Sequence, residues 1–549
     1  WLVPHTMATL SPNEASILSW GLVAAVLVLG IVCHMVYQYS RRGSPILVRL
    51  ATVWCWWCTF SLIYLLPIDL GPSARVGESL LHIWTFMYWT SFVLAWTVIP
   101  IAWYYYDVGD FTSWGKLRAA LRGNLRFYAI WGVLLIGFLI FLAVREDMSG
   151  QGVLGFAICL SNTWGLTLYV LLLGYGLVEI PRTFWYQSDL NKALEYCYYK
   201  AQVTHDLMER AADDLVCTQT LISKLKRTVS NDYLYHHQFS EIEESLGALD
   251  HVDLKMDGNL SDFSETDLFK EISDSKEPSL PLLIKTNRHV RISIRKYFRL
   301  RDTLQDTAEN GAYLESVIAR RSRDLPTICG QGLGGVGAAL RIRWMLRYRR
   351  MAFRAVSLIL ACMSILLIWS QLTIKARFLS PWALTYEFSR NSDFKTQIAM
   401  LIPLTYLCTC AFYSMFRLRL FDYYFMHSKR RTEEVSLLFN GTYLLRIFAP
   451  IGFNFVVLVG ARDTAFQKVM GAMDVVPFFG SAFNTYLPIL ISIFCLCTLF
   501  NVYNRLLRFL GIQQFSYGGR NDPDKLLEGK KIVASFSSSI RDEMADTFL

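Results

Sequence analysis

The sequence predicts an all-α, polytopic helical membrane protein with nine transmembrane helices and a cytosolic antiparallel coiled-coil hairpin between spans five and six. Three observations predict this fold. First, 53% of the 549 residues are hydrophobic and only 18% are charged, where a soluble domain usually carries about 25% charge. Second, apolar runs of about 20 residues recur, each long enough to cross a hydrocarbon core of roughly 30 Å. Third, 49 of the 99 charged residues lie in one stretch, 181–350, which leaves the remainder suited to lipid.

The apolar runs form two blocks of spans. Domain 1–179 holds spans one to five, and domain 351–510 holds spans six to nine. An odd number of spans puts the termini on opposite sides of the membrane. The first run lacks the basic start and small-residue cleavage site of a signal peptide, so we expect it to stay as an anchor. The nine predicted spans are 16–38, 47–68, 80–103, 125–144, 153–177, 352–373, 394–416, 434–460 and 483–508.

Basic residues in the short loops predict the orientation, because loops rich in Lys and Arg stay in the cytosol. With the N-terminus outside, the cytosolic loops hold ten basic residues and the outside loops hold seven. The sequence therefore favours an outside N-terminus and a cytosolic tail at 511–549. The cytosolic set is Arg41, Arg42, Lys116, Arg118, Arg122, Arg417, Arg419, Lys429, Arg430 and Arg431.

The charged stretch 180–350 is the one sizeable aqueous domain. From Leu194 to Val229, apolar or small residues recur at alternating spacings of three and four, which is a coiled-coil seam over five heptads. A second helical stretch, 282–322, carries a less regular apolar stripe, and we expect the two to pair as an antiparallel hairpin. Between them, residues 241–277 hold twelve acidic and three basic residues without a sustained period. This acidic tip is predicted to be flexible.

One span carries a charge near the centre of the bilayer. The eighth span places Arg446 among apolar residues, together with Asn440, Asn454 and Pro450. An arginine at this depth costs roughly 2.5–3.5 kcal/mol on translocon scales, so it should face the protein interior or a wet cavity. No Asp or Glu lies well inside a predicted span. The candidate partners are Asn440, Asn454, Asn162 and Ser161 of the fifth span, backbone groups freed by Pro450, or an anionic ligand. A purely structural arginine, satisfied by amides and carbonyls, fits the sequence as well as a ligand site.

A basic helix precedes the sixth span. Residues 341–350 interleave Arg with apolar residues, and such a segment can lie in the headgroup layer, where each cation contributes about 1 kcal/mol beside an anionic leaflet. We expect contact with anionic lipids, and ordinary positive-inside flanking is the alternative. The expected contacts are Arg341, Arg343, Arg347, Arg349 and Arg350.

The tail matches the loosely specified acidic-dileucine signal that clathrin adaptors bind. Asp522, Leu526 and Leu527 form the match, beyond the ninth span, where such a signal can reach a coat. A short amphipathic turn explains the same residues equally well. If adaptors bind the signal, the protein resides in the plasma membrane and in endosomal membranes. The tail from Gly518 onward is polar, and we expect it to be mobile.

The sequence nominates no catalytic, cofactor or metal site. A G-x-G-x-x-G string at Gly332, Gly334 and Gly337 follows no β-rich run and precedes no acidic residue at the required distance, so it indicates a linker. The sequence contains no P-loop, nucleophile elbow, H-E-x-x-H helix or paired-carboxylate site. The twelve cysteines indicate packing rather than a disulfide framework. The net charge of +9 reflects arginines beside membrane ends, so nucleic acid is not an expected partner.

Several local strings carry a resemblance to a known family: 176–182, 416–419, 423–424, 436–439, 454–455 and 511–515. Together with five spans, a cytosolic coiled-coil region and four further spans, they resemble the limb-region (LMBR-domain) membrane proteins, and more narrowly their second LMBR-domain-containing branch. The resemblance covers nearly the whole membrane part. It implies a non-enzymatic membrane protein linked to G-protein-coupled receptor signalling, notably that of adrenergic receptors, with no established active site.

Two hypotheses of function follow. The first is a regulator or scaffold of receptor signalling or trafficking that binds receptor or cytosolic proteins through the hairpin. The second is a transporter or lipid-handling protein with a polar cavity around Arg446. The blocks of five and four spans show no obvious internal copy, and this favours the first because many transporters are built from repeats. A coiled coil permits pairing within one chain as readily as dimerisation, so the oligomeric state stays open.

Overall fold

In the ranges that it describes, the regular secondary structure of the computed structural model is helical, apart from one isolated parallel bridge between Ser40 and Thr432. These ranges are 12–73, 78–145, 150–228, 233–247, 278–322, 344, 348–417, 426–427, 429–470, 480–500, 502 and 522–547.

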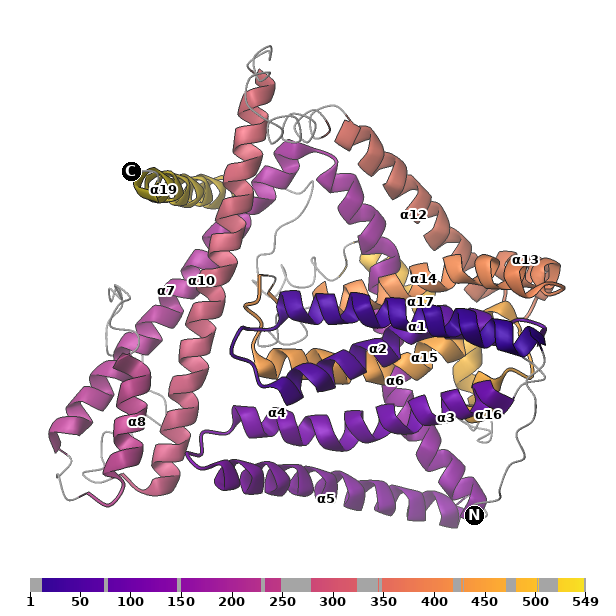
Figure 1. Cartoon of the computed structure of the whole chain (residues 1–549), viewed down its shortest axis with the longest axis horizontal. Coiled ribbons are helices and arrows are strands. Elements are labelled where there is room, and N and C mark those ends of the chain that lie inside the picture. The colour runs from indigo at the N-terminus through magenta and orange to yellow at the C-terminus, as the bar shows by residue number, and fades with distance from the viewer. Residues whose placement is uncertain are drawn as a thin grey trace. The chain divides into compact units, whose positions relative to one another are not determined.

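The chain divides into two compact units, whose helices are labelled in Figure 1. The membrane unit comprises Trp1–Trp103, Asn124–Thr183 and Val356–Phe509. The hairpin unit comprises Tyr104–Gly123, Phe184–Ala355 and Leu510–Leu549. In chain order the helices are α1 (Pro12–Tyr39), α2 (Ile46–Asp69), α3 (Glu78–Val93), the π-helical turn η2 (Leu94–Val98), α4 (Ile99–Asp107), α5 (Ser113–Arg145), α6 (Gly150–Gln187), α7 (Leu190–Thr228), α8 (His236–Gly247), α10 (Leu280–Ser322), α12 (Arg349–Leu372), the 3₁₀ turn η5 (Arg377–Leu379), α13 (Pro381–Ser389), α14 (Asp393–Arg417), α15 (Glu434–Val459), α16 (Ala465–Met470), α17 (Gly480–Leu499) and α19 (Pro523–Thr547).

Seven helices in the described ranges are long and apolar enough to cross a membrane. They coincide with the first, second, third, fifth, sixth, seventh and eighth predicted spans. The fourth predicted span, 125–144, lies in α5, and the ninth, 483–508, overlaps α17. Neither contains such a stretch among the residues described, so the count of nine stays a prediction. The seven are Ser19–Tyr39, Ile46–Asp69, Ser79–Asp107, Gly165–Gln187, Arg349–Leu372, Asp393–Phe416 and Glu434–Val459.

Helix α15 is the most enclosed element of the membrane unit's core. Its buried residues run from Val435 to Val459 and occur on every side of the helix, as expected where neighbouring helices surround an element. Helix α1, by contrast, leaves Trp20 and Leu22 exposed, as lipid-facing residues are. Helices α6 and α14 approach closely because Gly176 lies against the Cys410 carbonyl, where no Cβ fits. Small residues permit such close approach between membrane helices.

A buried carboxylate at the end of α2 connects three helices. Asp69 is only 1% exposed. It accepts hydrogen bonds from Trp84 Nε1 of α3 (3.1 Å) and from the backbone N–H groups of Ala465 (3.0 Å) and Phe466 (2.7 Å) at the start of α16. Its burial is tolerated because these three donors replace water. The predicted second span ended at residue 68, so the sequence did not identify Asp69 as a buried group.

Helices α7 and α10 of the hairpin unit pack side by side in opposite directions. At the start of α7, Leu190 packs with Leu314 and Val317, close to the end of α10. At the end of α7, Ile222 packs in one cluster with Leu282 at the start of α10. The antiparallel direction is the one that the two periodic stretches suggested, whereas a coiled-coil geometry stays a prediction.

Two polar contacts fix the register of α7 and α10. Tyr198 donates to Glu315 (2.5 Å), and Ser293 donates to Asp214 (2.7 Å). Burial and the Glu315 carboxylate raise the pKa of Tyr198, so the phenol remains a donor. Burial alone would raise the pKa of Asp214, but the adjacent His289 imidazole and the hydrogen bond from Ser293 outweigh it and lower that pKa below its usual value.

The loop between α4 and α5 packs on the first half of α10. The Asn287 side chain donates to the Gly109 carbonyl (2.8 Å), and Arg288 pairs with Asp107. A Cβ at Gly109 would collide with the backbone of α10. The loop therefore belongs with the hairpin, a grouping that the sequence did not predict.

The tail forms a helix against the hairpin, which corrects the expectation of a mobile tail from Gly518. Val533 of α19 is fully buried with Ala201 of α7 and Leu304 of α10. Gly529 lies against the backbone carbonyl of Tyr198, where no Cβ fits. The polar composition misled the prediction because one apolar stripe is enough to dock a helix.

Part of the acidic tip is helical as well. Helix α8 takes in 241–247 of the predicted flexible segment, because Phe239, Ile242 and Leu246 bury an apolar stripe in the cluster that joins the two arms. The remainder of the tip, 248–277, lies outside the described residues, as do the glycines of the predicted linker.

We expect Asp69→Asn to destabilise the membrane unit by about 2–3 kcal/mol, because the amide offers a donor where three donors already converge. The measurement is thermal unfolding of the purified protein in detergent, followed with a thiol-reactive dye that labels buried cysteines as they become exposed. Asp463→Asn is the matched control, since Asp463 is exposed in the adjacent loop. Equal unfolding temperatures for the two variants would contradict the role of Asp69.

Candidate functional site

Arg446 lies near the middle of α15. The helix has 26 residues, and twelve residues from Glu434 to Arg446 correspond to roughly 18 Å of rise. The residue is therefore close to the centre of the span, as predicted. Among the residues described, no carboxylate forms an ion pair with Arg446, and the buried Nε atom has no hydrogen-bond partner.

Aromatic rings surround the guanidinium group instead of acids. Its central carbon lies 4.8 Å from the ring centre of Trp96 and 5.5 Å from that of Tyr443. A cation over an indole ring is stabilised by the ring quadrupole, by about 2 kcal/mol or more where water is excluded. This attraction offsets most of the cost that the translocon scales assign to an arginine at this depth.

Two prolines leave backbone carbonyls without their helical donors at Arg446 and at its neighbour Trp96. Pro100 has no N–H to donate to the carbonyl of Trp96, four residues earlier, and the Tyr128 hydroxyl donates to that carbonyl instead. Pro450 likewise leaves the carbonyl of Arg446 without its helical donor. Trp96 also lies in the π-helical turn η2, a distortion that is common at functional sites.

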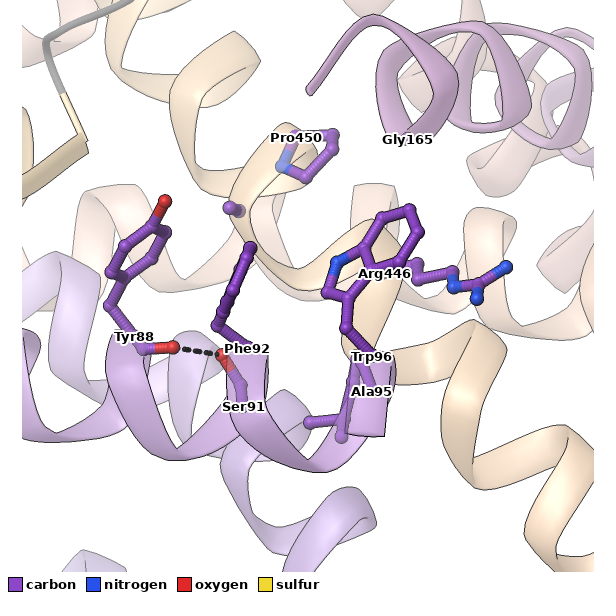
Figure 2. Close-up of a pocket in the computed structure, with 10 residues that line it drawn as sticks. Tyr88, Ser91, Phe92, Ala95, Trp96, Gly165, Arg446 and Pro450 are labelled. Carbon is purple, nitrogen blue, oxygen red and sulfur yellow. Dashed lines mark hydrogen bonds between the residues drawn. The ribbon is translucent and has the colours of Figure 1, made fainter. Parts of the chain in front are cut away.

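A small cavity lies beside Arg446, and Figure 2 shows the side chains around it. Its volume is about 50 Å³, which holds one or two water molecules or a single small anionic group. Gly165 of α6 closes one side, where a Cβ would lie 2.7 Å from the Arg446 carbonyl oxygen. The lining residues are Tyr88, Ser91, Phe92, Ala95, Trp96, Gly165, Leu445, Arg446, Ala449 and Pro450.

The polar groups of this lining are one guanidinium, one phenol and one hydroxyl. The Ser91 hydroxyl donates to the carbonyl of Tyr88 (2.8 Å), as the dashed line in Figure 2 marks. The ten lining residues include no carboxylate, histidine or cysteine, and Tyr88 is the one phenol among them. The arrangement can hold a positive charge and offer it to one small acceptor.

The asparagines predicted near Arg446 have other partners. Asn440 donates to the Ser436 carbonyl one turn earlier (2.8 Å). Asn454 accepts from Gln371 (2.6 Å) and from Tyr169 (3.2 Å), which connects α15 with α12 and α6. They lie six and eight residues from Arg446, at other heights of the helix. The side chain of Asn162 lies outside the described residues.

The other predicted contact residues lie in the hairpin unit. Arg341, Arg343 and Arg347 are outside the described residues. The guanidinium of Arg349 lies 5.0 Å from the ring centre of Phe353, and Arg350 is exposed.

The residues of the dileucine match lie at the start of α19. The Asp522 side chain accepts from the backbone N–H of Asp524 (3.1 Å), as a residue preceding a helix does. Leu526 is half-buried and Leu527 is exposed.

Sequence reasoning missed the aromatic residues around Arg446. Trp96 and Tyr128 are about 350 and 320 positions away in the chain, and no local pattern marks them as partners. Tyr443 precedes Arg446 by three residues, a spacing that places two side chains on one face of a helix, so this contact could have been predicted.

Comparisons with known proteins give one consistent result. The sequence profile of LMBR1-like membrane proteins matches residues 18–503. The chain is similar to "LMBR1 domain-containing protein 2 homolog" of Drosophila melanogaster, with 27% identity over 95% of this chain and 83% of that protein. It is similar to "G-protein coupled receptor-associated protein LMBRD2B" of Danio rerio (29%, covering 84% and 68%) and to "G-protein coupled receptor-associated protein LMBRD2" of Homo sapiens (26%, covering 92% and 82%). No solved structure matches the chain.

We expect Trp96→Leu to destabilise the parent protein more than it destabilises the Arg446→Met variant, because the ring stabilises the cation. The difference between these two destabilisations, which is the coupling free energy of Trp96 and Arg446, should be about 1–2 kcal/mol. It is measured by SDS titration of the protein in mixed micelles. Phe92→Leu is the matched control, since Phe92 also lines the cavity. Additive effects of Trp96→Leu and Arg446→Met would show that the ring contact contributes nothing.

Proposed function

Because the chain belongs to the LMBR1-like membrane protein family, we propose that it is a non-enzymatic regulator or scaffold in G-protein-coupled, adrenergic-type receptor signalling or in membrane trafficking. The observation that carries this proposal is the set of relatives whose names state association with G-protein-coupled receptors and that align over most of this chain. The membrane unit holds the protein in the bilayer, and the hairpin unit recruits receptor or cytosolic partners.

The hairpin suits this role because its stability does not depend on its outer surface. Seam residues such as Leu215 and Leu304 are fully buried between the helices, so a partner can bind the polar outer face without opening the core. The long helices α7 (39 residues) and α10 (43 residues) provide an extended surface of the kind that protein partners bind.

The arrangement in the membrane extends the same proposal. Nine spans, an outside N-terminus and a cytosolic tail are supported by the seven apolar helices and by the excess of basic residues in the predicted cytosolic loops. Contact of the arginines of 341–350 with anionic lipid is supported by the exposed Arg350 at the start of a spanning helix. The dileucine match is the basis for proposing the plasma membrane and endosomes as the location.

The cavity at Arg446 weighs against the alternative of a transporter or lipid-handling protein. Its volume of about 50 Å³ is far below the roughly 300 Å³ at which ligand pockets usually begin. The guanidinium group already lies close to two aromatic rings. Within the described residues, the site therefore favours a structural or small-anion role over passage of a solute.

The test of the receptor proposal is proximity labelling by the full-length protein with a labelling enzyme fused after α19. We expect adrenergic-type receptors to be labelled above the level given by an unrelated multi-pass protein. Leu304→Asp should abolish this enrichment, because a buried carboxylate in the seam, without a partner, separates the helices. Arg301→Gln, an exposed change on the same helix, is the matched control. Unchanged labelling by Leu304→Asp at equal membrane levels would refute the hairpin as the recruiting surface, and no receptor enrichment by the parent would refute the function itself.

The location is tested separately with Leu526→Ala/Leu527→Ala. If adaptors bind these leucines, the variant should show a higher surface fraction and slower antibody uptake than the parent. Because α19 is docked on the hairpin, Val533→Ala serves as the control that loosens the helix without changing the motif. Equal uptake by the parent and the double variant would leave the two leucines as an ordinary helical turn.

A further inference from the structure

Two loops far apart in the sequence join at one end of the membrane unit. The loop that connects α1 and α2 meets the segment that precedes α15, and both lie at the same end of these helices in Figure 1. Arg41 N–H donates to the Thr432 carbonyl (3.1 Å), Arg430 N–H to the Gln38 carbonyl (2.7 Å) and Thr432 N–H to the Tyr39 carbonyl (2.9 Å). These backbone bonds hold the two loops as one rigid surface.

The junction gathers six cations, which we name the cationic loop cluster: Arg41, Arg42, Arg49, Lys429, Arg430 and Arg431. Segments 36–52 and 426–436 contain these six and two acids, Glu433 and Glu434, so their formal balance is +4. The Glu434 carboxylate accepts from Ser44 (2.9 Å), which directs it toward the loop backbone. Like charges repel, so an arrangement that collects them at one place disfavours the fold unless an anion is bound there.

Several of these cations are held in place rather than free in solvent. The Arg49 guanidinium donates to the carbonyls of Arg41 (3.0 Å) and Arg42 (2.9 Å). Arg430 lies 4.3 Å from the ring centre of Tyr37. The buried Nε atoms of Arg49 and Arg430 have no hydrogen-bond partner among the described residues, and each can still donate to an acceptor that enters the cluster.

The backbone of the second loop is bent to present these side chains. Lys429 and Arg430 both have φ of 62°, the left-handed region that residues with a Cβ rarely adopt. Two successive residues in this conformation turn the chain sharply before α15 begins at Glu434. The bend brings their side chains to the same loop surface as Arg41 and Arg42.

The cluster borders exposed apolar side chains of a spanning helix. Ile46, Leu47 and Leu50, at the start of α2, are exposed by 71%, 74% and 58%, as expected of side chains that face acyl chains. The exposed cations Arg41 and Arg42 come immediately before them in the chain. A ligand of this surface therefore meets apolar side chains and several guanidinium groups together, which is the chemistry of an anionic lipid rather than of a free phosphate or a phosphopeptide.

We propose that the cationic loop cluster binds the headgroup of a polyphosphorylated inositol lipid in the leaflet that the loops face. Six cations exceed what one phosphodiester can neutralise, and the planar guanidinium forks match phosphate oxygens in pairs. Basic pockets between membrane helices are known to bind such headgroups. The site is separate from the hairpin and goes beyond the proposed receptor association, so either can fail without the other.

The experiment titrates short-chain phosphatidylinositol 4,5-bisphosphate into the full-length protein held in phosphatidylcholine nanodiscs. Arg41→Gln/Arg42→Gln should weaken binding about 30-fold, from two charges at roughly 1 kcal/mol each. Both residues are exposed, so the variant keeps the loop contacts. Lys375→Gln/Lys395→Gln, which removes two exposed lysines elsewhere in the membrane unit, is the matched control and should bind as the parent does.

Parallel titrations use short-chain phosphatidylserine, inorganic phosphate and a phosphorylated peptide. We expect each of these to bind at least tenfold more weakly than the inositol lipid. Equal affinity for phosphatidylserine at matched charge would reduce the cluster to non-specific attraction and overturn the proposal. Tighter binding of free phosphate or the peptide would also overturn it, as would unchanged binding of the inositol lipid by the cluster variant.

Discussion

A polar group inside a bilayer has no water to bind, so it must find its partner within the protein. Helix α15 is the clearest case, because it carries three polar side chains, Asn440, Arg446 and Asn454, in a span that is buried on all sides. Each group meets the constraint differently: Asn440 bonds to its own helix, Asn454 to an amide and a phenol of two other helices, and Arg446 to aromatic rings. The positions of η2, α6 and α12 around α15 follow from these contacts as well as from apolar packing.

The same constraint acts at the ends of the spans. Asp69 is buried beside the end of α2 because Trp84 and the start of α16 provide donors. Arg182 donates to the carbonyls of Thr498 and Leu499 at the end of α17 while it pairs with Glu179. Glu179 and Arg182 belong to the string 176–182 that resembled the family. At least part of that string therefore has a structural role, because it satisfies carbonyl groups at the end of a helix.

The hairpin unit is stabilised by a different interaction, because its surface is in contact with water. Its helices are polar on their outer faces and bury one apolar stripe each, so the hydrophobic effect rather than hydrogen bonding holds them together. The tail helix α19 completes this core through Val533, and Gly529 permits the close approach. Any partner that competes for the inner stripe must displace α19, whereas the outer surface is available directly. This difference favours binding at the outer face.

The sequence by itself determined the features that depend on local pattern. Runs of about 20 apolar residues identified the seven spans found among the described residues, a spacing of three and four identified the buried stripe of α7, and a lone charge in an apolar run identified Arg446. Tertiary structure alone decided which groups meet: Trp96 with Arg446, Gln371 with Asn454, Asp69 with α16, and Arg41 with Thr432. It also decided that the tail docks on the hairpin. The physical reason is that a helix repeats every 3.6 residues and reveals which of its faces is buried, whereas the partner of that face is set by packing between segments separated by tens to hundreds of residues.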